Sequence, residues 1–106
     1  MKRPIELHGD LAVDPAREAE MVEYFEKVYR PAAAKFPGYI DLHLLKLTSV
    51  PMGTRPAGLS YRFSIKYETE ELRLAWVASD VHTEVWGTLE RYFTSHDYTF
   101  LLFEVV

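Results

Sequence analysis

The sequence predicts one α+β domain, residues 1–106, with the element order β-α-β-β-α-β. Four short segments alternate apolar and polar residues, as strands do. Two longer segments between them repeat apolar residues at intervals of three and four, which is the period of a helix. Turn and capping residues separate these segments. We therefore expect a four-stranded antiparallel sheet with two helical segments on one face.

The first strand is expected over residues 4–13, which alternate in polarity. One face would carry Ile5, Leu7, Gly9, Leu11 and Val13, and the other Glu6, His8, Asp10 and Ala12.

A long amphipathic helix should follow, because Asp14 is a capping residue and Pro15 suits the first helical position. Its apolar stripe, which runs to the end of the helix, comprises Val22, Phe25, Tyr29, Ala32 and Phe36. Pro31 lies inside this helix and cannot donate a backbone hydrogen bond, so it predicts a kink or weakening near the last turns.

The two middle strands are expected over residues 39–49 and 59–68. The first would place Ile40, Leu42 and Leu44 opposite Tyr39, Asp41, His43, Leu45 and Leu47. The second would place Tyr61, Phe63, Ile65 and Tyr67 opposite Ser60, Arg62, Ser64 and Lys66. Residues 50–58 between them hold two prolines and two glycines, which predicts a mobile loop or lid.

Residues 69–93 carry both tryptophans and predict two short helices. Thr69 is a suitable N-cap, and acidic residues follow it in the first turn, where they meet the positive end of the helix dipole. Ser79 and Asp80 prefer a cap to a helix interior, so a second helix should begin there and run to about Phe93.

The second of these helices contains the residue of greatest chemical interest. Its apolar stripe comprises Trp86, Leu89 and Phe93, and His82 falls on the same stripe, four residues before Trp86. A titratable ring is thus aimed where only apolar groups would be expected.

The last strand, residues 98–106, is apolar on both faces except at Glu104. The complete order is the ferredoxin-like split βαβ pattern, in which helices cover one face of the sheet. A strand that is apolar on both faces needs a second layer, so we expect a homodimer that packs sheet to sheet. The polar residues of the open face balance in sign; they are Glu6, His8, Asp10, Asp41, His43, Arg62 and Lys66.

The composition excludes several functions. Sixteen acidic residues against twelve basic ones, with no basic run, argue against nucleic acid as a partner. The absence of cysteine excludes disulfides, thiolate catalysis and cysteine-ligated metal. No segment has the roughly 20 apolar residues that a membrane span needs, and the N-terminal residues lack the apolar core of a signal peptide. We expect a cytoplasmic protein without a membrane partner.

The segment Trp76-Val77-Ala78-Ser79-Asp80-Val81, followed by Glu84, resembles the Trp-x-x-Ser-Asp-Val segment of haem-degrading monooxygenases of the dimeric α+β barrel superfamily. The element order resembles the antibiotic-biosynthesis-monooxygenase (ABM) branch of that superfamily. The resemblance implies a dimeric α+β barrel, a pocket tryptophan at Trp76, and an enzyme that works without metal or flavin. Trp86 stands where the haem-degrading enzymes have their ligating histidine, and Gly9 where they have an asparagine. Haem is therefore disfavoured, and no cofactor is expected.

A pocket between the helices and the sheet would have aromatic walls and one polar centre. The candidate substrate-binding residues are Tyr29, Tyr61, Tyr67, Trp76 and Trp86, and the candidate catalytic residue is His82. The alternative is that these rings are core and that His82 is a hydrogen-bonded structural histidine. His8 and His43 would lie across the sheet from His82, so a shared metal site is not expected.

Two classes of function follow. The first is a small-molecule enzyme, a cofactor-independent monooxygenase acting on an aromatic or polyketide-like substrate, with His82 as the acid–base or oxyanion-binding group. The alternative is a non-catalytic dimeric stress or ligand-binding module. A cavity of roughly 300 Å³ or more beside His82 would favour an enzyme or a binder, and a filled core the structural role.

Overall fold

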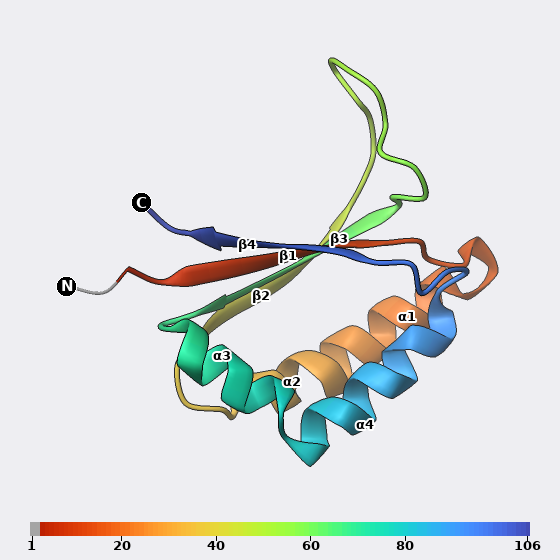
Figure 1. Cartoon of the computed structure of the whole chain (residues 1–106). Coiled ribbons are helices and arrows are strands. Elements are labelled where there is room, and N and C mark those ends of the chain that lie inside the picture. The colour runs from red at the N-terminus through yellow and green to blue at the C-terminus, as the bar shows by residue number, and fades with distance from the viewer. Residues whose placement is uncertain (1–2) are drawn as a thin grey trace.

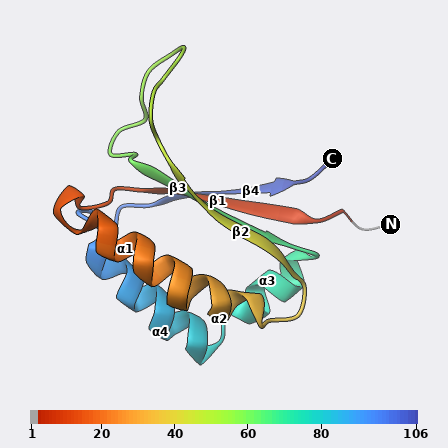
Figure 2. The same ribbon diagram turned by 180° about the vertical axis from the view of Figure 1, so that it is seen from behind.

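The computed structural model describes residues 3–106, and its elements follow the expected order (Figure 1). The four strands are β1 (Ile5–Leu11), β2 (Tyr39–Lys46), β3 (Tyr61–Tyr67) and β4 (Thr99–Glu104). They pair antiparallel in the order β2-β3-β1-β4, so β1 and β3 are central. The helices cover one face of this sheet, as the view from behind also shows (Figure 2). The ferredoxin-like α+β prediction is confirmed.

The first helical segment is not a uniform α-helix. A 3-10 turn (Pro15–Arg17) leads into α1 (Glu18–Tyr24), a π-helical turn (Phe25–Tyr29) follows, and α2 (Arg30–Ala34) completes the segment. The Asp14 carboxylate caps the start by accepting a hydrogen bond from the amide of Ala16 at 3.0 Å. The amide of Arg30 donates to the carbonyl of Phe25, five residues earlier, directly before Pro31. The predicted weakening near Pro31 therefore takes the form of a widened turn.

This widened turn changes which residues the segment buries. The buried positions are spaced by four and comprise Met21, Phe25, Tyr29 and Ala33. The predicted positions Val22 and Ala32 are only partly buried. In a regular α-helix, residues four apart point in slightly different directions, because a turn takes 3.6 residues. A π-helical turn contains more residues, so residues four apart stay on the same side of the helix. The predicted stripe therefore does pack on the core, but the fully buried line also includes Met21 and Ala33, which the prediction left out.

A β-bulge corrects the expected faces of β2. The pairing with β3 shifts between Tyr39 and Asp41, so Ile40 is an extra residue opposite no partner. Tyr39 consequently packs on the core, while Ile40 is 42% exposed. From Leu42 onward the faces are as predicted.

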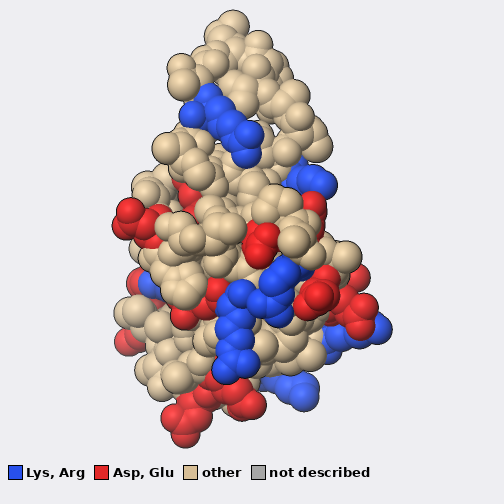
Figure 3. Space-filling view, turned by 90° about the vertical axis from the view of Figure 1, so that its right-hand side faces the viewer, with Lys and Arg blue, Asp and Glu red and all other residues tan. Residues whose placement is uncertain are grey.

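The faces of β3 are as the alternation predicts, and its helix-facing residues Tyr61, Phe63, Ile65 and Tyr67 are all buried. The connection from β2 to β3 forms a long loop that projects from the sheet on the side away from the helices (Figures 1 and 2). Met52 in this loop is 92% exposed. Figure 3 shows the loop standing clear of the body, with acidic and basic side chains interleaved below it.

The two short helices begin and end as predicted. They are α3 (Glu70–Val77) and α4 (Asp80–Leu89), which a 3-10 turn (Glu90–Tyr92) extends. The Thr69 side chain accepts a hydrogen bond from the amide of Leu72, and that of Ser79 accepts one from the amide of His82. Within the described part of the chain, none of the helices has the length and apolar character needed to cross a bilayer.

The edge strand β4 is exposed on both faces in the single chain. Its apolar residues Phe100, Leu101, Leu102 and Phe103 are 43–49% exposed. Phe100 lies opposite Gly9 on the face toward the helices, so Leu101 and Phe103 lie on the open face.

Candidate functional site

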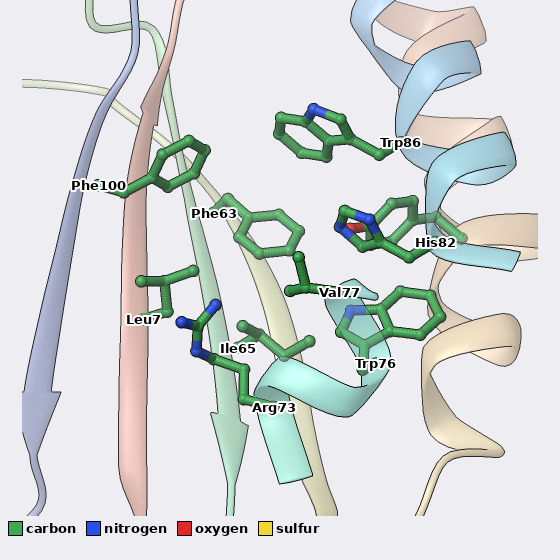
Figure 4. Close-up of a pocket in the computed structure, with 10 residues that line it drawn as sticks. Leu7, Phe63, Ile65, Arg73, Trp76, Val77, His82, Trp86 and Phe100 are labelled. Atoms are coloured by element: carbon green, nitrogen blue, oxygen red, sulfur yellow. The ribbon is translucent and has the colours of Figure 1, made fainter. Parts of the chain in front are cut away.

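A cavity of about 340 Å³ lies between the helices and the sheet (Figure 4). Its lining residues are Leu7, Tyr29, Phe63, Ile65, Arg73, Trp76, Val77, His82, Trp86 and Phe100. The volume exceeds the roughly 300 Å³ that a small-molecule site needs. The aromatic residues therefore do not simply fill the core. The loop expected as a lid supplies no lining residue and projects from the other side of the sheet.

The helix period brings the cavity residues together. On α3, Arg73, Trp76 and Val77 stand three and four positions apart and so share one face. On α4, His82 and Trp86 stand four apart and do the same. The sheet closes the other side.

Trp76 is both core and cavity wall. It is buried, and its ring packs edge to face against Tyr29 and Phe36, with centroid distances of 6.0 and 4.9 Å. Tyr29 is also buried and reaches the cavity from the π-helical turn. These contacts fix the wall rigidly, because each ring is held by others.

His82 lies between the two indoles. Its ring stands perpendicular to that of Trp76 at 5.0 Å and nearly parallel to that of Trp86 at 6.3 Å, measured between centroids. Within residues 3–106, the His82 amide donates to the Ser79 hydroxyl, and no residue forms a hydrogen bond with the His82 imidazole. Burial lowers the pKa of His82, and the positive charge of Arg73 lowers it further. The imidazole is thus an uncharged base near neutral pH, in the direction that the sequence predicted.

Ser79 couples the two halves of this site. Its hydroxyl donates to the carbonyl of Trp76 at 2.7 Å and accepts from the amide of His82 at 3.1 Å. One side chain therefore joins the end of α3 to the start of α4, and with them the two site residues.

Arg73 is a cavity residue that the sequence reasoning missed. Its side chain is 13% exposed and extends from α3 toward Leu7 and Ile65 (Figure 4). Its Nε donates to Oε2 of Glu70 at 2.9 Å, and its Nη2 pairs with the other carboxylate oxygen. The spacing to Trp76 could have indicated that Arg73 shares the cavity face.

Tyr61 and Tyr67 are not among the residues that line the cavity. The Tyr61 hydroxyl donates to Glu18 at 2.9 Å, and burial with this carboxylate raises the pKa of Tyr61 to about 12. The Tyr67 hydroxyl donates to the carbonyl of Ala33 at 3.5 Å, and burial raises the pKa of Tyr67. Both residues serve as hydrogen-bonded core.

The two positions expected to disfavour haem are occupied by aromatic packing. A Cβ atom on Gly9 would lie 2.3 Å from Cε1 of Phe100, so the Phe100 ring fills the space of a larger side chain. The Trp86 ring lies 6.0 Å from the same phenyl ring. These residues do not fit the haem-degrading pattern. Within residues 3–106 no three His, Asp or Glu side chains form a group that could hold a metal ion.

No protein-family profile matches the chain, and no curated protein matches it either. Solved structures match over nearly its whole length. A candidate antibiotic biosynthesis monooxygenase from Bordetella bronchiseptica is 18% identical, with a TM-score of 0.78 and coverage of 99% of both chains. A candidate of the same class from Nitrosomonas europaea is 8% identical, with a TM-score of 0.78, and covers 100% of this chain and 93% of its own.

SnoaB from Streptomyces nogalater, described as a cofactor-independent oxygenase, is 17% identical with a TM-score of 0.73. The match covers 97% of this chain and 93% of SnoaB. At such identities the likeness concerns the fold, and the chain has an ABM-like fold, as its element order predicted.

Proposed function

We propose that this protein is a cofactor-independent monooxygenase of the ABM-like class, which oxidises an aromatic or polyketide-like small molecule with His82 as general base. The observation that carries the proposal is the imidazole of His82, half-buried between two indoles at the wall of a 340 Å³ cavity. Its lowered pKa leaves it able to accept a proton near neutral pH. The shared fold with SnoaB supports the oxygenase class.

The chemistry needs a substrate that is its own electron donor. His82 would take a proton from an acidic C–H group of the bound molecule, and the resulting carbanion would reduce dioxygen and form a C–O bond. Loss of water then leaves a carbonyl, so the balanced change is R₂CH₂ + O₂ → R₂C=O + H₂O. The protein's part is to hold a flat anion against Trp76 and Phe63 in a cavity whose lining is mostly apolar.

Oxygen uptake tests this proposal. An anthrone such as 1,8-dihydroxyanthrone serves as probe, because its methylene group is acidic and flanked by aromatic rings. We expect His82→Leu to lower turnover by roughly 10²–10⁴-fold, the usual contribution of a positioned base. His96→Leu, on an exposed residue of the segment before β4, away from the cavity and the open face, is the control and should leave turnover unchanged. Equal rates in the wild type and His82→Leu would refute the role of His82. Tight binding without oxygen uptake would favour the non-catalytic ligand-binding module.

We also propose that the protein forms a homodimer through the open face of its sheet. Charges on this face are already paired within the chain: Arg62 contacts Asp10 at 2.9 Å, and Glu6 contacts Lys66 at 3.7 Å. Leu101 and Phe103 remain exposed beside these pairs. A surface with paired charges and uncovered apolar side chains favours burial against a second copy of itself.

A further inference from the structure

Among the described residues, the cavity lining contains one cation, Arg73, beside the neutral base, and this cation is not the group that accepts the substrate's proton. Arg73 contributes the guanidinium, while the rest of the lining apart from His82 is apolar or aromatic. A charged group in such a surrounding acts strongly on whatever shares the space, because the local dielectric constant is low.

The guanidinium is held in one orientation. Glu70 binds it from the side, through Nε and Nη2, and both residues stand on the first turn of α3. Within residues 3–106, the hydrogen bonds of the Arg73 side chain go to Glu70. A guanidinium has five N–H donors, so the two on Nη1 and the second one on Nη2 remain for another acceptor. The two contacts with Glu70 hold the guanidinium in place before a ligand arrives, which lowers the entropic cost of binding an acceptor.

The cation lies deeper than its counter-ion. The Arg73 side chain is 13% exposed and that of Glu70 is 35% exposed. Figure 4 shows the guanidinium directed toward the sheet, between Leu7 and Ile65. Water therefore screens the carboxylate more than the guanidinium, so the positive charge is expected to dominate inside the cavity. The effect of Arg73 on the pKa of His82 agrees with this sign.

We propose that Arg73, oriented by Glu70, makes this cavity selective for a flat aromatic ligand that carries an oxyanion, either a carboxylate or an ionised hydroxyl. The oxyanion would accept from Nη1 of Arg73, while the ring lies against Phe63 and Ile65. This assignment shares its cavity with the proposed function, yet it concerns binding and can be measured without turnover.

Matched probes test it. The carboxylate pair is 2-naphthoate and 2-naphthamide, and the ionised-hydroxyl pair is 4-nitrophenol and 4-nitroanisole at pH 8.5. Both tryptophans of the chain line the cavity, so quenching of their fluorescence reports occupancy by the naphthalene probes; calorimetry serves the nitro compounds. We expect the wild type to bind at least one anion about tenfold more tightly than its neutral partner, as a charge-assisted hydrogen bond would give. The pair that shows the preference distinguishes the two kinds of oxyanion.

Three variants separate the proposed contact from general effects. Arg73→Met should abolish the preference by weakening the anion about tenfold, with the neutral probe unchanged. Glu70→Gln keeps one oxygen acceptor to hold the guanidinium and removes a competing anion, so it should keep or raise the preference. Arg91→Met, which makes the same change on an exposed residue of the 3-10 turn after α4, away from the cavity and the open face, should have no effect. If Arg73→Met does not fold, Arg73→Lys replaces it and should reduce the preference, because an ammonium lacks the fork.

The result that overturns the proposal is an equal affinity for the anionic and neutral members of both pairs, or a preference that survives Arg73→Met. Failure of the wild type to bind either anion at millimolar concentration overturns it too. A preference for the anion without oxygen uptake would leave this inference standing and refute the oxygenase. Oxygen uptake that depends on His82, without a preference for the anion, would support the oxygenase and refute this inference.

Discussion

Replacing Ser79 by alanine should destabilise the protein and disturb the cavity together. The change removes the N-cap of α4, which is worth about 1 kcal/mol. It also removes the hydroxyl hydrogen bond to the carbonyl of Trp76, worth about another 1 kcal/mol. That carbonyl still accepts from the amide of residue 79 at 3.1 Å, so no buried acceptor is left unpaired. We expect a total loss of about 2 kcal/mol.

For a domain of this size, such a loss lowers the melting temperature by roughly 10 °C. Circular dichroism melting of Ser79→Ala against Ser79→Thr measures it, because threonine keeps the hydroxyl and tolerates the extended backbone of residue 79 (φ −78°, ψ 153°). Ser79→Thr should remain within about 0.5 kcal/mol of the wild type. Ser79→Ala should also weaken binding of 2-naphthamide, since His82 and Trp76 lose their shared link. Equal melting temperatures for the two variants would show that the cap contributes nothing.

Three further predictions follow from the structure. Burial lowers the pKa of His82, so the unfolded chain binds a proton at this residue more readily than the folded protein does. The contribution of the neutral His82 to the free energy of unfolding should therefore be complete above about pH 6.5 and be lost as the pH falls below that value. Urea unfolding at pH 8 and pH 5 should show a larger loss of stability for the wild type than for His82→Leu, and equal losses would contradict this. Leu101→Asp or Phe103→Asp should dissociate the proposed dimer in sedimentation experiments, whereas Val28→Asp, on an exposed helix position, should not; a soluble wild-type monomer at micromolar concentration would exclude the dimer. Haem titration should give no sharp Soret shift of a histidine-ligated complex, and stoichiometric haem binding that is lost in His82→Leu would show this expectation to be wrong.

Local chemistry made part of this fold predictable. The caps at Thr69 and Ser79 follow from residue type alone, because their hydroxyls satisfy the free amides of the helix that begins there. The alternation of β3 likewise identifies its buried face without knowledge of any partner. His82 was recognisable because a polar ring on an apolar stripe conflicts with the pattern around it.

Tertiary pairing decided what the sequence left out. The bulge at Ile40 depends on how β2 meets β3, which no local pattern encodes. Tyr61 and Tyr67 lie on the predicted face of β3, but at its two ends, whereas the cavity lies against Phe63 and Ile65 in the middle. The alternation of a strand predicts which face is buried. The part of that face that the helices leave open as a cavity is known only from the packed structure.

Arg73 was missed for a different reason. A charged residue three positions after Glu70 is typical of an ion pair on the solvated side of a helix. Here the sheet packs over this face of the helix and buries the Arg73 side chain. A surface motif and a buried binding group can thus have the same sequence.

The π-helical turn Phe25–Tyr29 implies that this helix is more sensitive to its length than to its composition. The turn sets the rotational phase between Met21, which is buried before it, and Ala33, buried after it. Insertion or deletion of one residue would rotate one half by about 100° relative to the other, and Met21 or Ala33 would then leave the sheet. Substitution of the exposed Val28 leaves that phase intact. Evolution of this cavity wall is therefore expected to proceed by exchange of residues, with the number of residues between the two buried anchors held constant.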